Sequence, residues 1–503
     1  MKIKFLIATL PQKGINADLL ILFFEKAFIR KRQKNMRPFP EDIAKVLLDY
    51  FNLKDFSGEF NETAMIYPEN LSGIKRILFV GLGEHSDPTK DQLAELSSTV
   101  SKIQKKVSSK RNYVLLCNVY FNKERLLKSF VEGVFYERYR VDKFSSKENE
   151  KEIEHHYVFV CKKAEYTPRF RKIVQTTASY MESVNITRDL ANRPSNLLPP
   201  DKLKDEVEGI FANFPEISTT HLDENDLRQN NMNALLAVSQ GSKAKPYLIL
   251  IHYKPKKTAK KKLALIGKGV TFDSGGISIK PSANMEEMKF DMAGAAAVVG
   301  MMSVIARIKP KFEVIGVIPA VENMPDGGAI KPGDIVTAHN GKTIEIINTD
   351  AEGRLILADA LSYTETTYKP DLMIDFATLT GAAVVALGDK MAALFTASDQ
   401  LAQVLLNAGE KSADLLWRMP LLESYFEELK SDFADIKNIG SRWGGAVTAA
   451  KFLEQFVAKT RWAHIDIAGT AYNVSHKKFM KKGATGFGPK LLAEALNKLD
   501  KIM

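Results

Sequence analysis

From residue 247 onward the chain alternates short apolar runs with helical patterns, and this alternation constrains the fold more than any other feature of the sequence. Such an order is typical of a mostly parallel sheet covered by helices. The sequence therefore predicts an α/β fold for this part of the chain. The predicted strands are 247–252, 263–267, 312–320, 343–347, 372–377 and 463–467, and the predicted helices are 292–308, 355–368 and 446–457.

The length of 503 residues exceeds the usual size of one hydrophobic core, so we expect more than one domain. Residues 1–165 contain their own strand and helix patterns and predict a smaller α/β domain. A long helical pattern then leads to Pro199-Pro200, which ends the connection, and 166–200 is predicted to be a helical linker. Residues 201–503 form the second predicted domain.

Composition excludes several classes of protein. Apolar residues make up 45% and charged residues 26%, as in an ordinary soluble protein, and no apolar run is long enough to span a bilayer. Cys117 and Cys161 offer no disulfide framework, which fits a reducing compartment, so we expect a cytoplasmic protein.

The net charge of +11 includes a lysine-rich run at 254–262, which we interpret as a solvated loop. Nucleic-acid binding stays open only as an additional role, because no aromatic residues accompany the lysines.

Residues 348–355, Asn-Thr-Asp-Ala-Glu-Gly-Arg-Leu, place two carboxylates and a guanidinium within five positions. This octet joins the predicted strand 343–347 to the predicted helix 355–368, and ligands usually bind at the carboxyl ends of strands in open α/β sheets. The alternative is a simple helix start, with Asp350 as N-cap and Glu352 stabilised by the helix dipole. The octet alone leaves both interpretations open.

A second polar cluster, residues 267–276, follows the predicted strand 263–267 and contains Lys268, Asp273 and four glycines. Glycines in such numbers indicate a tight turn or a close approach to a ligand. Lys280 follows this cluster, and Asp291 precedes the small-residue run 294–297. If these segments converge with the octet, one site holds the four carboxylates Asp273, Asp291, Asp350 and Glu352.

Four negative charges cannot share a crevice without cations or protons, and two divalent metal ions would balance them. Two-metal hydrolases use such a pair to activate a water and to polarise the scissile carbonyl. Carboxylate-rich ligation suits Mn, Zn, Mg or Co. Lys268 can act as a ligand only if it is neutral, and burial and neighbouring cations would both lower its pKa.

Other catalytic motifs fail on inspection. The sequence has no HExxH motif, and none of its eight histidines forms a ligand pair at helical spacing. Gly341-Lys342-Thr343 resembles the end of a phosphate loop, but Val336 stands where that loop requires its first glycine. No Gly-x-Ser-x-Gly elbow is present either, so a serine hydrolase has little support.

These residues resemble the leucyl aminopeptidases, a family of di-metal exopeptidases that remove N-terminal amino acids. The octet matches the family signature at every position, and the resemblance is dense from about residue 192 to the end. Further segments that match are 267–276, 288–292, 323–327, 331–334, 377–381, 462–469 and 484–488. The resemblance implies a macro-domain-like α/β unit at the N-terminus, a homohexamer and peptide substrates.

The resemblance also implies a role for each ligand candidate. Asp273 and Glu352 look like the carboxylates that bridge both metal ions. Asp350 looks like a ligand of the more weakly bound ion, and Lys268 and Asp291 look like ligands of the more tightly bound one.

Two further residues resemble the catalytic pair of the family. Lys280 resembles the lysine that polarises the substrate carbonyl. Arg354 resembles the arginine that holds a bicarbonate ion, which accepts the proton of the attacking water. The positions that resemble the pocket for the first side chain, and that favour Leu and other apolar residues, are Met288, Thr378, Leu379 and Gly381. A narrower dipeptidase, such as a cysteinylglycine hydrolase, and an additional DNA-binding role remain as alternatives.

Overall fold

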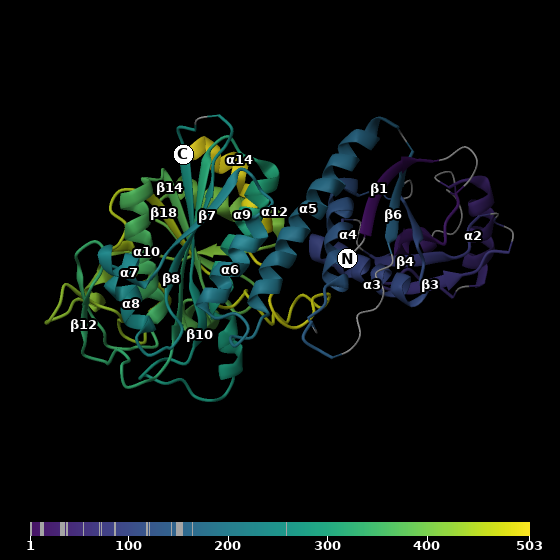
Figure 1. The fold of residues 1–503 in the computed structure, drawn as a ribbon. Coiled ribbons are helices and arrows are strands. Elements are labelled where there is room, and N and C mark those ends of the chain that lie inside the picture. The colour runs from purple at the N-terminus through teal and green to yellow at the C-terminus, as the bar shows by residue number, and fades with distance from the viewer. Residues whose placement is uncertain are drawn as a thin grey trace. The chain divides into compact units, whose positions relative to one another are not determined.

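The computed structural model forms two compact units. Unit 1 comprises Met1–Met181 and Lys477–Lys481, and unit 2 comprises Glu182–His476 and Lys482–Met503 (Figure 1). Residues 3–503 are described except for 11–14, 31–35, 37–38, 54, 70, 72, 85–86, 117–118, 120, 142, 147–153, 163 and 258. Cys117 therefore lies outside the described residues, whereas Cys161 is buried in a strand of unit 1.

A six-stranded sheet forms the centre of unit 1, and its strands pair in parallel except at the β3–β4 edge. In spatial order the strands are β1 (Ile3–Thr9), β6 (His155–Cys161), β5 (Arg111–Leu115), β2 (Leu19–Glu25), β4 (Ile77–Gly83) and β3 (Thr63–Ile66). The helices include α1 (Lys26–Arg30), α2 (Glu41–Leu53), α3 (Lys90–Lys106) and α4 (Lys123–Arg138). The predicted smaller α/β domain is confirmed.

The sequence explains several elements of unit 1. Strand β2 is apolar from Leu19 to Phe24, as a strand buried on both faces of a parallel sheet must be. It was not predicted, because a short apolar run fits a buried helix segment as well as a strand. Helix α3 begins with a capping box, in which Thr89 accepts from the Gln92 backbone and the Gln92 side chain accepts from the Thr89 backbone.

Unit 2 is built on a nine-stranded sheet whose centre is parallel. Strands β18, β14, β9 and β11 pair in parallel, and antiparallel pairs lie towards both edges. The order is β16 (Leu416–Arg418), β15 (Ala392–Phe395), β18 (Arg461–Asp466), β14 (Leu372–Ala377), β9 (Lys262–Gly267), β11 (Glu313–Asn323), β8 (Tyr247–Tyr253) and β7 (Ile217–Leu222), with β10 (Gly269–Asp273) beside β11. The predicted mostly parallel sheet is confirmed.

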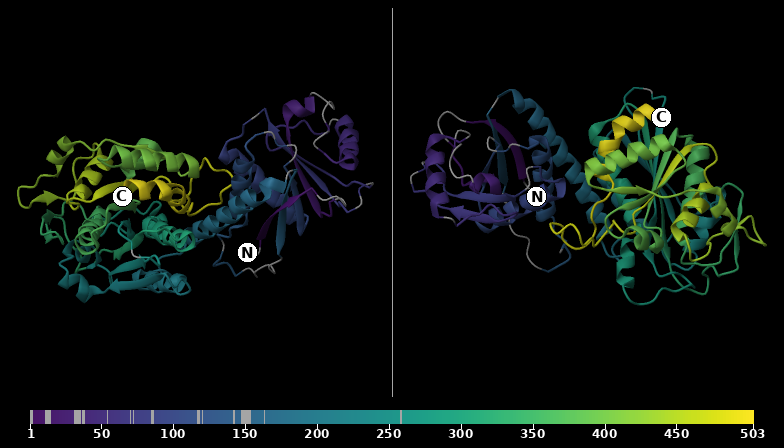
Figure 2. Two further views of the ribbon diagram at one scale, coloured as in Figure 1. Left: turned by 90° about the horizontal axis from the view of Figure 1, so that it is seen from above. Right: turned by 180° about the vertical axis from the view of Figure 1, so that it is seen from behind.

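Helices cover both faces of this sheet (Figures 1 and 2). On β11, the Gly316 position faces Val298 and Met302 of α9 (Ala293–Ile308), while Ile315 and Val317 share a core with α10 (Glu352–Tyr368). Alternate residues of a strand point to opposite faces, so α9 and α10 lie on opposite sides of the sheet. The other helices include α5 (Thr167–Ala191), α6 (Pro200–Phe211), α7 (Glu224–Gln229), α8 (Asn233–Ser239), α11 (Gly381–Leu387), α12 (Asp399–Ser412), α13 (Gly445–Glu454) and α14 (Pro489–Ile502).

The predicted strand 343–347 is shorter than expected and does not join the large sheet. Strand β13 (Thr343–Glu345) belongs to a separate three-stranded sheet with β12 (Ile335–Thr337) and β17 (Ile436–Lys437). The physical reason lies in its burial: Ile344 is buried between two half-buried neighbours, whereas the strands at the centre of the large sheet are buried throughout. The octet therefore reaches the site from a small lateral sheet.

One helical stretch, Met285–Ile308, is long and apolar enough to cross a membrane. It is longer than the apolar run in the sequence suggested, because the 3₁₀ helix η2 (Met285–Met292) leads directly into α9. However, 89% of its most apolar window is buried inside the protein, as in the core helix of a globular domain. The lysine-rich run links β8 to β9, and Lys254, Lys256, Lys257 and Lys260 are exposed there.

Candidate metal centre

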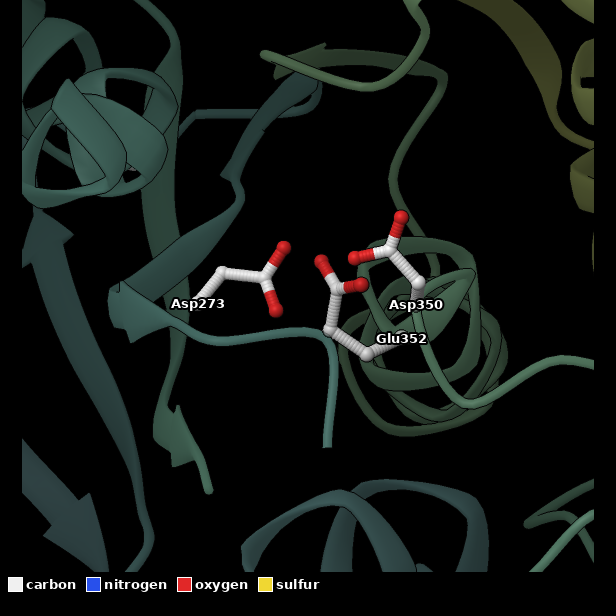
Figure 3. A group of neighbouring side chains, drawn as sticks. All are labelled: Asp273, Asp350 and Glu352. Atoms are coloured by element: carbon white, nitrogen blue, oxygen red, sulfur yellow. The ribbon is translucent and has the colours of Figure 1, made fainter. Parts of the chain in front are cut away.

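Three carboxylates meet at one edge of the large sheet (Figure 3). Asp273 ends β10, Asp350 lies in the turn before α10, and Glu352 is the first residue of α10. Each offers an oxygen atom, and these oxygens lie within 4.8 Å of one another. Asp273 and Glu352 are buried and Asp350 is half-buried. This spacing is suited to metal ligands that share their ions.

Lys268 and Asp291 lie beside Glu352. Lys268 occupies the link between β9 and β10, and its Nζ lies 2.8 Å from Asp291 Oδ1 and 2.9 Å from Glu352 Oε1. The same Nζ donates a 3.0 Å hydrogen bond to the carbonyl of Thr378, at the carboxyl end of β14. Residues from β9, β10 and β14 thus converge at the strands' carboxyl ends, where ligands of α/β sheets bind.

Lys280 lies on the opposite flank of the cluster. Its Nζ is 2.7 Å from Asp273 Oδ2 and also contacts Asp350 Oδ1. Burial lowers the pKa of Lys280, but the charges of Asp273 and Glu352 raise it by a larger amount. Its pKa therefore lies above the ordinary lysine value. Lys280 is therefore a cation that faces the shared carboxylates.

The protein anchors one oxygen of two of these carboxylates and leaves other oxygens without donors. Asp273 Oδ1 accepts hydrogen bonds from Asn323 Nδ2 at 2.8 Å and Gly275 N at 2.9 Å, and Asp291 Oδ1 accepts one from Thr378 Oγ1 at 2.8 Å. Asp291 Oδ2 and Glu352 Oε2 are buried and find no donor among the described residues. Buried oxygens without donors are costly in a protein interior, and a bound cation would satisfy them.

Electrostatics support the same conclusion. Four carboxylates and two lysines leave a local excess of two negative charges (4 − 2 = 2). Burial and the nearby charge of Asp273 raise the pKa of Glu352, while the charge of Lys268 opposes this. Burial also raises the pKa of Asp291. The residues present therefore fit bound divalent cations, which would remove the cost of the excess charge.

Two opposing effects set the pKa of Lys268. Burial lowers the pKa of its ammonium group, but the charges of Asp291, Glu352 and Asp273 raise it by more, so the pKa lies above the ordinary value. The lowering by neighbouring cations stays a prediction that depends on bound metal ions. A metal ion that takes Lys268 as a ligand has to displace its proton.

The alternative interpretation of Asp350 as the N-cap of the following helix is wrong. The N-cap of α10 is Ala351, which provides no side-chain hydrogen bond, so Asp350 does not cap the helix. Instead, the side chain of Asn348 accepts the Asp350 N–H at 2.8 Å and orders the turn before it. The side chain of Asp350 remains directed at the cluster of carboxylates (Figure 3).

Arg354 is buried, and the charge of Glu352 acts on its guanidinium group. Its Nη1 donates a 2.8 Å hydrogen bond to the backbone carbonyl of Asn438, while its Nε finds no acceptor among the described residues. Burial lowers the pKa of Arg354 to about 10, although the charges of Glu352 and Asp466 act in the opposite direction. A buried guanidinium with an unused donor is suited to hold a small anion.

The four candidate pocket residues come from two segments. Met288 lies half-buried in η2, the 3₁₀ helix that also carries Asp291, and Thr378 contacts Asp291 and Lys268 directly. Leu379 follows on the turn that leads into α11, and Gly381 is the first residue of that helix. The structure thus brings Thr378 into the cluster and places the other three on segments that adjoin it.

Three supporting residues were not singled out by the sequence. Asn323 ends β11 and holds both Asp273 and the Thr349 carbonyl. Buried Asp466 ends β18 and accepts hydrogen bonds from Leu379 N and Thr380 Oγ1. Asn438 binds the octet itself. Asn323 and Asp466 lie inside matched segments, which could have indicated them, but Asn438 lies in none.

Comparisons with known proteins agree with this geometry. The family model described as "Cytosol aminopeptidase family, catalytic domain" matches residues 185–493, and the corresponding N-terminal domain model matches residues 23–148. A probable cytosol aminopeptidase of Geotalea uraniireducens (strain Rf4) is 40% identical over 90% of this chain and 91% of its own. The cytosol aminopeptidase of Haemophilus influenzae (strain ATCC 51907) is 39% identical over the same shares.

A solved structure is similar over nearly the whole chain. The bottromycin maturation enzyme BotP in complex with Mn superposes with a TM-score of 0.82 at 31% identity, and the match covers 96% of this chain and 99% of that one. The similarity therefore includes both units.

Proposed function

The chain belongs to the cytosol aminopeptidase family, and from this premise we propose that it removes N-terminal Leu and other apolar residues from peptides by a two-metal mechanism. The observation that carries the proposal is the donor set: the predicted ligands converge, and two of their buried carboxylate oxygens have no donor among the described residues. We further propose that the enzyme acts in the cytosol.

The ligand assignment follows the resemblance to the family, and the positions of the side chains support it. Asp273 and Glu352 face each other and would be shared by both ions, with Asp350 as a further ligand of one ion and Lys268 and Asp291 as ligands of the other. When bound, two divalent ions, Mn or Zn with Mg or Co as alternatives, would supply Lewis acidity and an activated water. The ligand side chains would fix the positions of the two ions.

Two cationic residues would complete the catalysis. Lys280, held by Asp273 and Asp350, would donate a hydrogen bond to the carbonyl oxygen of the substrate as negative charge develops on it. Arg354, with its unused Nε donor, would hold a bicarbonate ion as the base that accepts a proton. The cluster contains no histidine that would act as the general base. A bound bicarbonate would therefore fill the role that the described side chains leave open.

The specificity proposal rests on the residue types beside the ligands. Met288, Thr378, Leu379 and Gly381 present no charge to a substrate side chain. An uncharged surface beside the metal centre favours apolar first residues such as Leu and Met. We also propose a homohexamer, which sedimentation velocity would test: a protein that remains monomeric at micromolar concentration would contradict it.

The direct test is hydrolysis of leucine-p-nitroanilide by the purified protein. We expect turnover with Mn²⁺ or Zn²⁺, loss of turnover after chelation with EDTA, and recovery when the metal is restored. Glutamyl-p-nitroanilide serves as the matched substrate, and we expect it to be cleaved much more slowly. Turnover that resists chelation, or no turnover with any of the four metals, would overturn the mechanism.

A narrower peptide substrate is the second candidate, because the similar structure of BotP is described as that of a bottromycin maturation enzyme. A panel of dipeptides that includes Cys-Gly, Leu-Gly and Met-Gly separates the candidates. Comparable kcat/KM values for Leu-Gly and Met-Gly would support the broad enzyme. A single strongly preferred dipeptide would support the narrow one.

A further inference from the structure

We propose that Asn438 is a positioning residue that holds both ends of the octet 348–355 in register with the metal centre. Asn438 touches none of the proposed ligands and would act through the octet. The inference rests on the proposed function, because the octet supplies Asp350, Glu352 and Arg354 to that chemistry.

The side chain of Asn438 binds the backbone where the octet begins. Its Oδ1 accepts hydrogen bonds from Ile347 N at 2.8 Å and Asn348 N at 3.3 Å, and its Nδ2 donates to the Asn348 carbonyl at 2.7 Å. The side chain is completely buried. One amide group thus satisfies three backbone groups of a segment that belongs to no strand.

These bonds extend the small sheet beyond its last strand residues. Strand β13 pairs with β17 through Ile344–Ile436 and Glu345–Lys437, and Asn438 N then donates to the Glu345 carbonyl at 2.9 Å. Beyond this point the two backbones no longer pair, and the Asn438 side chain binds the backbone of Ile347 and Asn348 instead. The pairing of β13 with β17 therefore also fixes the position of the Asn348 backbone.

The backbone of Asn438 binds the other end of the octet. Its carbonyl accepts the 2.8 Å hydrogen bond from Arg354 Nη1, and Arg354 Nε has no acceptor among the described residues. One buried residue therefore fixes Asn348 with its side chain and Arg354 with its main chain. Between these two points, the Asn348 side chain holds the Asp350 N–H.

A structural role alone predicts a different pattern from a positioning role. A buried amide that only stabilises the fold would change the melting temperature when removed, and leave the folded fraction fully active. A residue that orients the octet would change kcat and metal affinity in protein that remains folded, because small displacements of reacting groups have large effects on rate.

The test compares Asn438→Ala with Asn112→Ala in the full chain. Asn112 is the matched control, because it is also completely buried and its Nδ2 donates to the His156 carbonyl at 3.0 Å in unit 1. We expect both variants to melt at lower temperature. Only Asn438→Ala is expected to lower kcat, by about tenfold or more, and to weaken Mn²⁺ binding in a calorimetric titration. The control is expected to keep kcat within about twofold of the wild type.

A double-mutant cycle with Asn348→Ala provides the decisive readout, because the Asn438 side chain binds the Asn348 backbone and the Asn348 side chain holds the Asp350 N–H. If Asn438 acts through the octet, its removal from the Asn348→Ala background costs far less rate than its removal from the wild type. Additive effects, or a wild-type kcat and Mn²⁺ affinity in Asn438→Ala, would overturn the inference. If Asn438→Ala does not fold, Asn438→Asp, which keeps the Oδ1 acceptor, takes its place in the cycle. A wild-type protein without metal-dependent turnover would instead overturn the proposed function, and the Mn²⁺ titrations would still decide the role of Asn438.

Discussion

Asp273 divides its two carboxylate oxygens between the protein and the centre. Asn323 and Gly275 hold Oδ1, and Oδ2 faces Lys280. An oxygen fixed in this way has little freedom to move when a metal ion binds, so the donor is preorganised. Such a fixed donor supports the role of common ligand that we propose for Asp273.

We predict that Asp273→Ala loses Mn²⁺ binding and turnover together, because both ions lose their shared ligand. The rate of leucine-p-nitroanilide hydrolysis should fall on the order of 10²-fold or more. Metal analysis after gel filtration gives the occupancy. Asp326→Ala, at an exposed aspartate of a nearby loop, is the control and should keep both properties. Full occupancy in Asp273→Ala would contradict the ligand assignment.

Asp359 provides a pH prediction away from the metal centre. It is completely buried on α10 and accepts backbone hydrogen bonds from Leu235 and His339. Burial raises its pKa from 3.8 to about 7, against the effect of these bonds. The folded state therefore binds a proton that the unfolded state has released. As pH rises through this window the fold loses stability, by up to about 1.4 kcal/mol per pH unit.

Asp359→Asn removes this titration. We expect the variant to gain stability relative to the wild type as pH increases from 5 to 8, which thermal denaturation of both proteins at each pH would measure. If the difference in stability between the two proteins stayed constant from pH 5 to 8 instead, the backbone donors would outweigh burial, and the pKa of Asp359 would not be raised.

At the scale of elements, α10 begins unusually close to Lys268. A Cβ atom on Gly353 would lie 2.5 Å from Lys268 Cε and 2.7 Å from its Nζ. Alanine normally stabilises a helix relative to glycine by about 0.5–1 kcal/mol. Here the lysine would have to leave its place between Asp291 and Glu352. The glycine of the octet is therefore explained by the close approach of a side chain rather than by backbone conformation.

We predict that Gly353→Ala folds but binds Mn²⁺ more weakly, by about tenfold or more, as expected when a ligand is displaced. Gly209→Ala in α6 is the matched control, since a Cβ there meets nothing within 4 Å. The control should be as active as the wild type and at least as stable. Isothermal titration with Mn²⁺ and thermal melting compare the two, and unchanged Mn²⁺ affinity in Gly353→Ala would contradict the packing argument.

The sequence predicted the elements whose pattern is strong. Strand β14 was predicted at its observed bounds, and β9 and α10 within a few residues, because buried apolar runs alternate there with helical spacing. The small sheet was missed as a separate layer, because strands of two or three residues carry no distinctive pattern. The clustering of Asp273, Asp350 and Glu352 was predictable from charge and position. Asn438 was not, because a side chain that binds backbone atoms 90 residues away leaves no local signal.

At the scale of the whole molecule, metal binding should stabilise one unit selectively. All proposed ligands lie in unit 2, as do the three tryptophans, Trp417, Trp443 and Trp462. A ligand that binds only the folded state adds about 2.7 kcal/mol of stability at a hundredfold excess over its Kd. Tryptophan fluorescence therefore reports on the unit that the metal stabilises.

We predict that Mn²⁺ raises the melting temperature measured by tryptophan fluorescence, and that EDTA reverses the shift. In the Asp273→Ala variant the same addition should have no effect. Differential scanning calorimetry should show no metal-dependent shift in the transition of unit 1. A shift of equal size in the wild type and in Asp273→Ala would mean that Mn²⁺ acts at another site.

The return of residues 477–481 to unit 1 has a consequence for any attempt to cut the gene between the units. Lys481 Nζ donates to the carbonyls of Glu137 and Tyr139, and the ring of Phe479 lies 5.5 Å from that of Tyr136. A gene that starts at codon 182 would leave these five residues without their partners and expose the Phe479 ring to water. Replacing them with a short polar linker would remove this source of aggregation from the shortened protein.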